Sequence, residues 1–263
     1  MIANLKFIAL LIKLKLSHMM VFRLSFFGAF FSDAALFVMQ LAAFQAIYGQ
    51  VDAIGGWSRG QMLIFIGTFS MINGLSMLIC FFGIVNIPDK IRGGDLDLYL
   101  TKPVNPLLRL TFENINLGSA PLLFLSGGIV AHGAAVEGAA VTMPLILAYS
   151  ALTLLMALLY YDIDLIMRTL PFFFIGTNAI NRMTDALVIL NFRVPGVIYK
   201  GVFKVLFWFV LPYGVMATVP TQALTGALTP LGLLYALGIV ALFTAFALRF
   251  WRFGLSRYKS ASS

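Results

Sequence analysis

Long apolar stretches alternate with short polar ones along almost the whole chain. We expect five membrane spans at residues 24–48, 61–84, 114–130, 141–161 and 231–250. Each is long enough for a helix that crosses a bilayer, which needs roughly 17–25 residues. A further span is expected within residues 165–192. The pattern therefore predicts an all-α integral membrane protein with six transmembrane helices in one domain, residues 1–263.

The region before the last span admits two readings. In the first, the fifth span has a polar face that carries Asn178, Arg182 and Asp185, and residues 195–222 form a re-entrant segment because three prolines interrupt them. Arg182 and Asp185 would be neighbours on one helical face and could neutralise each other.

In the second reading, residues 162–200 stay on the cytoplasmic side and residues 201–219 form the fifth span. The rule that basic loops stay inside favours this reading, because it places Arg193, Lys200 and Lys204 in the cytoplasm. The number of spans is the same in both.

Two features precede the second span. Residues 1–23 are expected to form an interfacial helix on the inner leaflet, with a solvated basic tail as the alternative. On the first span, Asp33 and Gln40 lie seven residues apart and so share one face. An acidic side chain within the membrane faces either the bundle interior or a polar path. Asp33 and Gln40 could therefore form hydrogen bonds between helices or line such a path. The same two roles are open for Asn73 on the second span.

The longest polar interruption lies between the second and third spans, at residues 85–112. It carries four cations, which place it in the cytoplasm: Lys90, Arg92, Lys102 and Arg109. Pro88 can begin a helical turn that Gly94 ends, and Asp95 can cap the segment that follows. In that segment leucines alternate with polar residues, which predicts a short two-sided element before Pro103: Leu96, Leu98 and Leu100.

Composition supports a membrane protein and narrows its chemistry. The chain is 61% hydrophobic and 11% charged, too apolar for a soluble domain. The net charge of +8 follows membrane orientation, with both termini cytoplasmic, rather than nucleic-acid binding. Its one cysteine and two histidines suggest no metal site. No phosphate-binding loop of the G-x-x-x-x-G-K-[ST] type occurs, so the chain is not expected to be an ATPase or another enzyme.

Two motifs carry a resemblance to a known family. The second span starts at Gly56-Trp57-Ser58. After it comes the pattern Ile-x-x-Gly-x-Leu-Asp-x-x-Leu-x-x-Pro, formed by Ile91, Gly94, Leu96, Asp97, Leu100 and Pro103. In this combination the chain resembles the membrane subunits of bacterial ABC-2-type transporters.

The resemblance implies the permease subunit of an ATP-binding cassette transporter in the bacterial plasma membrane, with export favoured over import. A second permease subunit, identical or related, would complete the path, and a separate ATPase subunit would bind ATP and Mg. The central loop would couple to that ATPase through the residues of the motif and Arg92. Membrane lipid is the other expected partner. The substrate stays open.

Two other classes compete with this hypothesis. An ion-coupled secondary transporter would use Asp33 and Asp185 as ion sites, although no internal repeat of the kind common in such folds is evident. A purely structural subunit would tolerate changes at Asp33, Asn73 and Arg182, whereas a transport path would not.

Overall fold

The computed structural model describes residues 55–174 and 196–258 without a break, together with short stretches and single positions before residue 55 and between 182 and 194. These residues form helices and turns, with no strand among them. Four helical segments are long and apolar enough to cross a membrane: Arg59–Ile79, Leu117–Glu137, Met143–Phe172 and Pro230–Arg257. The all-α fold is confirmed for this part of the chain. Six spans are not, since two of the predicted spans fall mainly outside the described residues.

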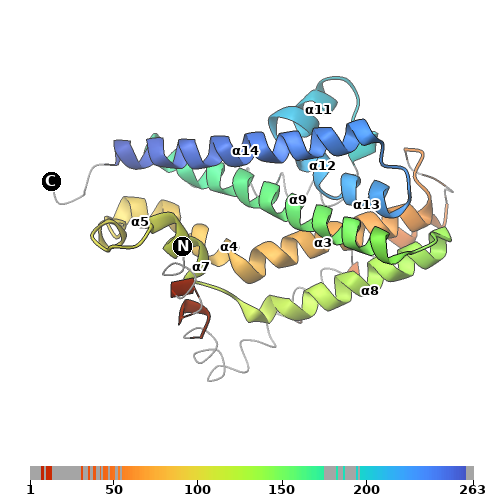
Figure 1. Cartoon of the computed structure of the whole chain (residues 1–263), viewed down its shortest axis with the longest axis horizontal. Helices are drawn as coiled ribbons and strands as arrows, with labels where there is room; N and C mark the ends of the chain where they lie inside the picture. Colours follow the sequence, from red (N-terminus) through yellow and green to blue (C-terminus); the bar gives the residue numbers. More distant parts are fainter. Residues whose placement is uncertain are drawn as a thin grey trace.

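The long helices lie side by side along the longest axis of the molecule (Figure 1). Helix α9, Met143–Thr169, lies between α14, Pro230–Arg257, and α3, Arg59–Ile79. Helix α8, Ala120–Glu137, packs on the other side of α3. The central loop, residues 85–112, lies at the end of the bundle where α14 finishes. We call this the loop end, and the other the opposite end.

Helices α3 and α8 form the most extensive contact of the bundle, and small residues make it possible. A Cβ atom at Gly67 would lie 2.7 Å from Val130 Cγ2 and 2.9 Å from the Ser126 carbonyl oxygen. A Cβ at Gly133 of α8 would lie 2.8 Å from the backbone nitrogen of Ile64. The backbones approach so closely that no side chain fits between them, which is how membrane helices commonly associate.

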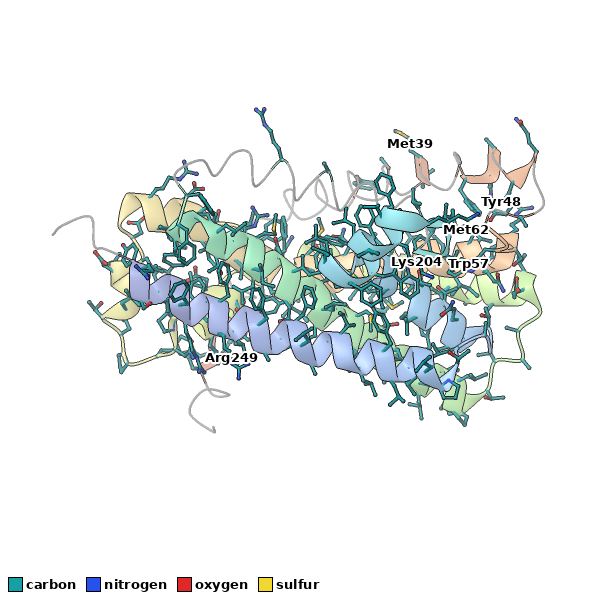
Figure 2. The ribbon with its side chains drawn as sticks, turned by 90° about the horizontal axis from the view of Figure 1, so that it is seen from above. Met39, Tyr48, Trp57, Met62, Lys204 and Arg249 are labelled. Atoms are coloured by element: carbon teal, nitrogen blue, oxygen red, sulfur yellow. The ribbon has the colours of Figure 1, made fainter. Side chains whose placement is uncertain are left out.

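The start of α3 is fixed to the end of α8. Ser58 caps α3 by accepting a hydrogen bond from the Gln61 backbone N–H at 3.1 Å, and the Gln61 side chain accepts one in return from the Ser58 N–H. The Ser58 hydroxyl also donates to Glu137. Trp57 lies beside this cap (Figure 2), buried against the ring of Phe65 with centroids 5.8 Å apart.

The fourth predicted span ends too early. Helix α9 continues beyond residue 161 to Thr169 and buries three ionisable side chains that lie outside the predicted span. Arg168 pairs with Asp164 at 3.2 Å, and Asp162 accepts a hydrogen bond from Thr244 of α14. Because these groups find partners inside the bundle, they extend the helix instead of ending it. The third span is also longer than predicted, since α8 reaches Glu137.

The predicted re-entrant segment, residues 195–222, contains two helical pieces bent by 77° against each other, Gly201–Val210 and Tyr213–Leu224. The first comprises α11, Gly201–Val205, and a π-helical turn, Leu206–Val210; the second comprises α12, Tyr213–Met216, and α13, Thr218–Leu224. A three-residue 3₁₀ turn precedes them at Gly196–Ile198. They gather where α14 begins (Figure 1), and α13 packs against α9 and α3. Such a bend suits either a broken span or a re-entrant loop.

Candidate functional site

The central loop folds into short helices that the turn-forming residues delimit. Helix α4, Phe81–Ile84, is followed by α5, Ile87–Gly93, with Pro88 in its first turn. Gly94 ends α5 at φ 78°, a conformation that glycine adopts without strain. The predicted roles of Pro88 and Gly94 are confirmed.

The segment after Gly94 differs from the prediction. It forms a helical turn, α6, Asp97–Leu100, and the three leucines of the predicted two-sided element do not share one side of it. Leu96 and Tyr99, three residues apart, point inward at 0% and 7% exposure, while Leu98 is 61% and Leu100 42% exposed. The predicted cap is also wrong, because Leu96 takes the N-cap position and no side chain bonds there.

Tyr99 is the centre of a polar cluster that joins α5, α6 and α7, Pro106–Phe112. Its hydroxyl accepts a hydrogen bond from Lys90 Nζ at 2.6 Å and donates to the Glu113 carboxylate, whose two oxygens lie 2.8 and 2.9 Å away. The Arg109 guanidinium lies 4.4 Å from the centre of the Tyr99 ring, a cation–π distance. One side chain from each short helix therefore meets Glu113, which follows α7.

Electrostatics keep this cluster in one protonation state at neutral pH. Glu113 lies 3.4 Å from Lys90 Nζ and 3.8 Å from Arg109 Nε. Burial of Lys90 opposes its charge, but its hydrogen bond to Tyr99 and the attraction of Glu113 outweigh burial and raise the pKa of Lys90 above its ordinary value. Burial raises the pKa of Tyr99, so the phenol stays a neutral donor to Glu113.

An apolar core beneath the cluster fixes the loop to the long helices. Leu96 and Tyr99 pack with Leu165 of α9 and Trp251 of α14. The base of the loop is equally tight, because a Cβ atom at Gly83 would overlap the Leu110 carbonyl oxygen. The loop therefore packs as part of the bundle and has no separate core.

Two further contacts add to this attachment. The hydroxyls of Thr111, on α7, and Tyr161, on α9, are 2.8 Å apart. Tyr258, which follows α14, packs against the same apolar core as Leu96, and burial and the Asp97 carboxylate raise the pKa of its phenol. A displacement of the loop would therefore act on the loop-end turns of both α9 and α14.

The structure separates the predicted loop residues into two groups. Leu96 is fully buried, and Ile91, Gly94 and Asp97 are half-buried. The exposed members are Arg92, Leu100 and Pro103, beside the exposed Leu98. The second group therefore presents its side chains most fully at the molecular surface.

The predicted intramembrane residues are described only in part. Asn73 accepts a hydrogen bond from the Tyr160 hydroxyl at 3.4 Å, which joins α3 to α9. Arg182 is exposed. The remaining predicted positions lie outside the described residues: Asp33, Gln40, Asn178 and Asp185.

Glu113 is the residue of the cluster that the sequence reading missed. Its spacing of four residues from Arg109 was a usable signal, since such pairs meet on a helix. Its meeting with Lys90 and Tyr99 depends on the fold of the loop and has no signal in the spacing.

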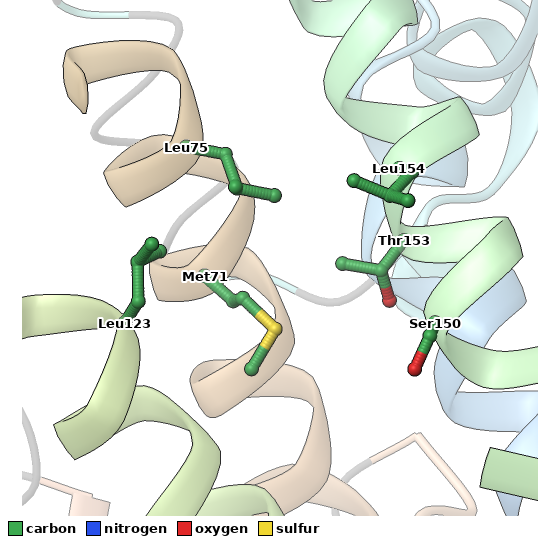
Figure 3. Close-up of a pocket in the computed structure, with 6 residues that line it drawn as sticks. All are labelled: Met71, Leu75, Leu123, Ser150, Thr153 and Leu154. Atoms are coloured by element: carbon green, nitrogen blue, oxygen red, sulfur yellow. The ribbon is translucent and has the colours of Figure 1, made fainter. Parts of the chain in front are cut away.

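A second feature lies within the bundle. A cavity of about 220 Å³ opens between α3, α8 and α9 (Figure 3). Four of its lining side chains are apolar and two carry hydroxyls: Met71, Leu75, Leu123, Leu154, Ser150 and Thr153. Thr153 donates its hydroxyl proton to the Tyr149 carbonyl oxygen, so the cavity offers little polar recognition. No group of three metal-binding side chains occurs in the described part of the chain.

Comparison with known proteins gives one match. The family model described as ABC-2 family transporter protein matches residues 34–262. No curated protein and no solved structure matches the chain.

Proposed function

Because the chain belongs to the ABC-2 family of transporter proteins, we propose that it is the membrane-spanning permease subunit of an ATP-binding cassette exporter. Its apolar helices and its family indicate a multi-pass membrane protein. In this proposal it pairs with a second permease, a copy or a relative, in a bacterial plasma membrane. A separate ATPase subunit binds ATP and Mg.

The loop end is the cytoplasmic face in this proposal, with both chain termini on that side. The exposed cations of the loop and the last turns of α14 support this orientation, because short basic segments stay inside. They are Arg92 and Lys102 in the loop, and Arg249, Arg252 and Arg257 on α14.

The single observation that carries the proposal is the pair of exposed leucines on α6, whose other side is buried against the bundle. Leu98 and Leu100 are large apolar side chains at a surface that is otherwise polar and charged, and such exposed apolar side chains suit a protein contact. Their helix, α6, is held from behind by Leu96 and Tyr99. The ATPase would dock on Leu98, Leu100 and the flanking Arg92 and Pro103.

Coupling follows from how α6 is attached. Closure of the ATPase on ATP would push α6, and two routes lead from α6 to the long helices. One runs from Tyr99 through Glu113 toward α8, and the other from Leu96 through the shared core to α9 and α14. A rigid-body shift of the short helices would thus rock the spans.

The test is co-purification of the chain from membranes with a candidate ATPase encoded by a neighbouring gene. We expect Leu98→Ser together with Leu100→Ser to abolish the complex while the variant still inserts in the membrane and keeps its thermal midpoint. Val141→Ser is the matched control, because Val141 is an exposed apolar side chain, 47% accessible, beyond the end of α8. A complex that survives the double substitution would move the docking surface elsewhere, and a wild-type chain that binds no ATPase would overturn the proposed function.

A further inference from the structure

The last turns of α14 carry three arginines that serve the proposed function only as a sign of orientation. Arg249, Arg252 and Arg257 are all exposed. Within residues 55–174 and 196–258, none of the three forms an ion pair. Figure 2 shows Arg249 on the side of α14 that faces away from the other long helices. Three unpaired cations thus stand within nine residues of one helix.

Beside these arginines lies a continuous row of stacked rings. Phe173 stacks on Phe250 at 5.5 Å and on Phe253 at 5.4 Å, and Phe246 stacks on Phe250 at 5.6 Å. Arg257 covers the Phe253 ring at 5.3 Å. Phe246 and Phe253 remain 51% and 48% exposed, so the row is an accessible apolar surface with cations at its edge.

The position of the arginines along α14 matches the edge of a bilayer. Arg249 comes 19 residues after Pro230, the first residue of the helix, and this corresponds to about 28 Å at 1.5 Å per residue. The hydrocarbon core of a bilayer is about 30 Å thick. When Pro230 lies at one boundary of the core, Arg249 therefore lies at the other, level with the phosphate groups, and the exposed Phe246 lies within the acyl region.

We propose that this surface is a binding site for an anionic phospholipid of the leaflet at the loop end. The guanidinium groups of Arg249 and Arg252 bind the phosphate and the second charge of the headgroup, since guanidinium forms paired hydrogen bonds to phosphate oxygens. The Phe246–Phe250–Phe173 row carries the upper part of an acyl chain. The two acidic residues of α9, Asp162 and Asp164, are buried and bonded to Thr244 and Arg168, so they do not neutralise the arginines.

The experiment is native mass spectrometry of the purified full-length chain, titrated with dioleoyl phosphatidylglycerol or with dioleoyl phosphatidylcholine. We expect the wild type to bind phosphatidylglycerol at least tenfold more tightly. The combined substitution Arg249→Gln and Arg252→Gln should weaken phosphatidylglycerol binding by about fivefold for each arginine removed, and should leave phosphatidylcholine binding unchanged. The combined substitution Phe246→Ala and Phe253→Ala should weaken the binding of both lipids.

Lys200→Gln with Lys204→Gln is the matched control. Both lysines are exposed: Lys200 caps α11 and Lys204, labelled in Figure 2, lies on it, toward the opposite end. Their removal changes the net charge by the same amount. Equal affinity of the wild type for the two lipids would overturn the proposal. So would an equal loss in the lysine and arginine variants, because binding would then follow net charge alone. Neither result depends on the ATPase, so the proposal and the proposed function fail separately.

Discussion

The α3–α8 contact and the central loop hold helices together by opposite means. Between α3 and α8 the side chains are absent where the backbones cross, at Gly67 and Gly133, and the contact is steric. In the loop, helices of four to seven residues meet through the charged and polar side chains of Lys90, Tyr99, Arg109 and Glu113. Helices so short have little stability of their own and depend on tertiary contacts.

The difference indicates which region can move. A contact made of close backbones has one arrangement and tolerates no insertion, whereas a cluster of half-buried charges can be weakened one bond at a time. The loop end therefore suits a part that receives a push, and the α3–α8 pair suits a rigid body that is moved as a whole.

The largest effect is expected from breaking the steric contact. Gly133→Leu must displace α3, because even a Cβ atom there would lie 2.8 Å from the Ile64 backbone nitrogen and 3.0 Å from the Gly60 carbonyl oxygen. We expect it to lower the free energy of unfolding by about 3 kcal/mol, or to abolish insertion. The measurement is the thermal midpoint in detergent.

Gly128→Leu is the control for this prediction. It makes the same change on the same helix, at an exposed position where a Cβ atom would meet nothing within 4 Å. If both variants lose the same stability, the loss reflects the added leucine itself and not the crossing of α3 and α8.

A smaller effect is expected from removing the carboxylate of the Tyr99 cluster. Glu113→Ala leaves Lys90 and Arg109, whose side chains are 20% and 28% exposed, without their shared partner, and should cost about 1–2 kcal/mol. Chymotrypsin cleavage after the exposed Leu100 should become faster, which reports on the loop alone.

Asp89→Ala is its matched control. Asp89 also pairs with an arginine in the loop, Arg92 at 3.6 Å, but its side chain is 78% exposed. Exposed pairs contribute little, so neither stability nor cleavage should change. Equal cleavage rates in the two variants would mean that the Tyr99 cluster does not hold the loop.

In the loop, the boundaries of a helix could be predicted from the sequence, but which side chains are buried could not. Pro88 and Gly94 act through their own covalent geometry, which is why their roles could be inferred without a fold. The sequence did not show that Leu96 is buried and Leu98 exposed. An alternating pattern and a helical turn predict different buried residues, and four residues are too few to distinguish the two patterns.

The buried charges of α9 could not be predicted from the sequence either. Asp162, Asp164 and Arg168 suggest a cytoplasmic loop by composition, and only the tertiary structure supplies Thr244 as a partner and buries the Asp164–Arg168 pair. The packing role of Gly67 was predictable, since small residues on a membrane helix favour close contact. The family was predictable because the two motifs resemble those of ABC-2-type transporters, and the family match over residues 34–262 confirms it.

The smallest effect separates hydrogen bonding from ring packing within the cluster. Tyr99→Phe keeps the ring beneath Arg109 and loses the two hydrogen bonds of the hydroxyl, so we expect a loss of about 0.5–1.5 kcal/mol at pH 7. The folded chain raises the pKa of both Tyr99 and Lys90, so the cluster's contribution is complete below about pH 10 and declines as the pH rises through the folded values. The difference in thermal midpoint between wild type and Tyr99→Phe should therefore narrow above about pH 10. A difference that stays constant between about pH 7 and 11 would show that the ring, and not the hydroxyl with its charged partners, fixes α6 to the bundle.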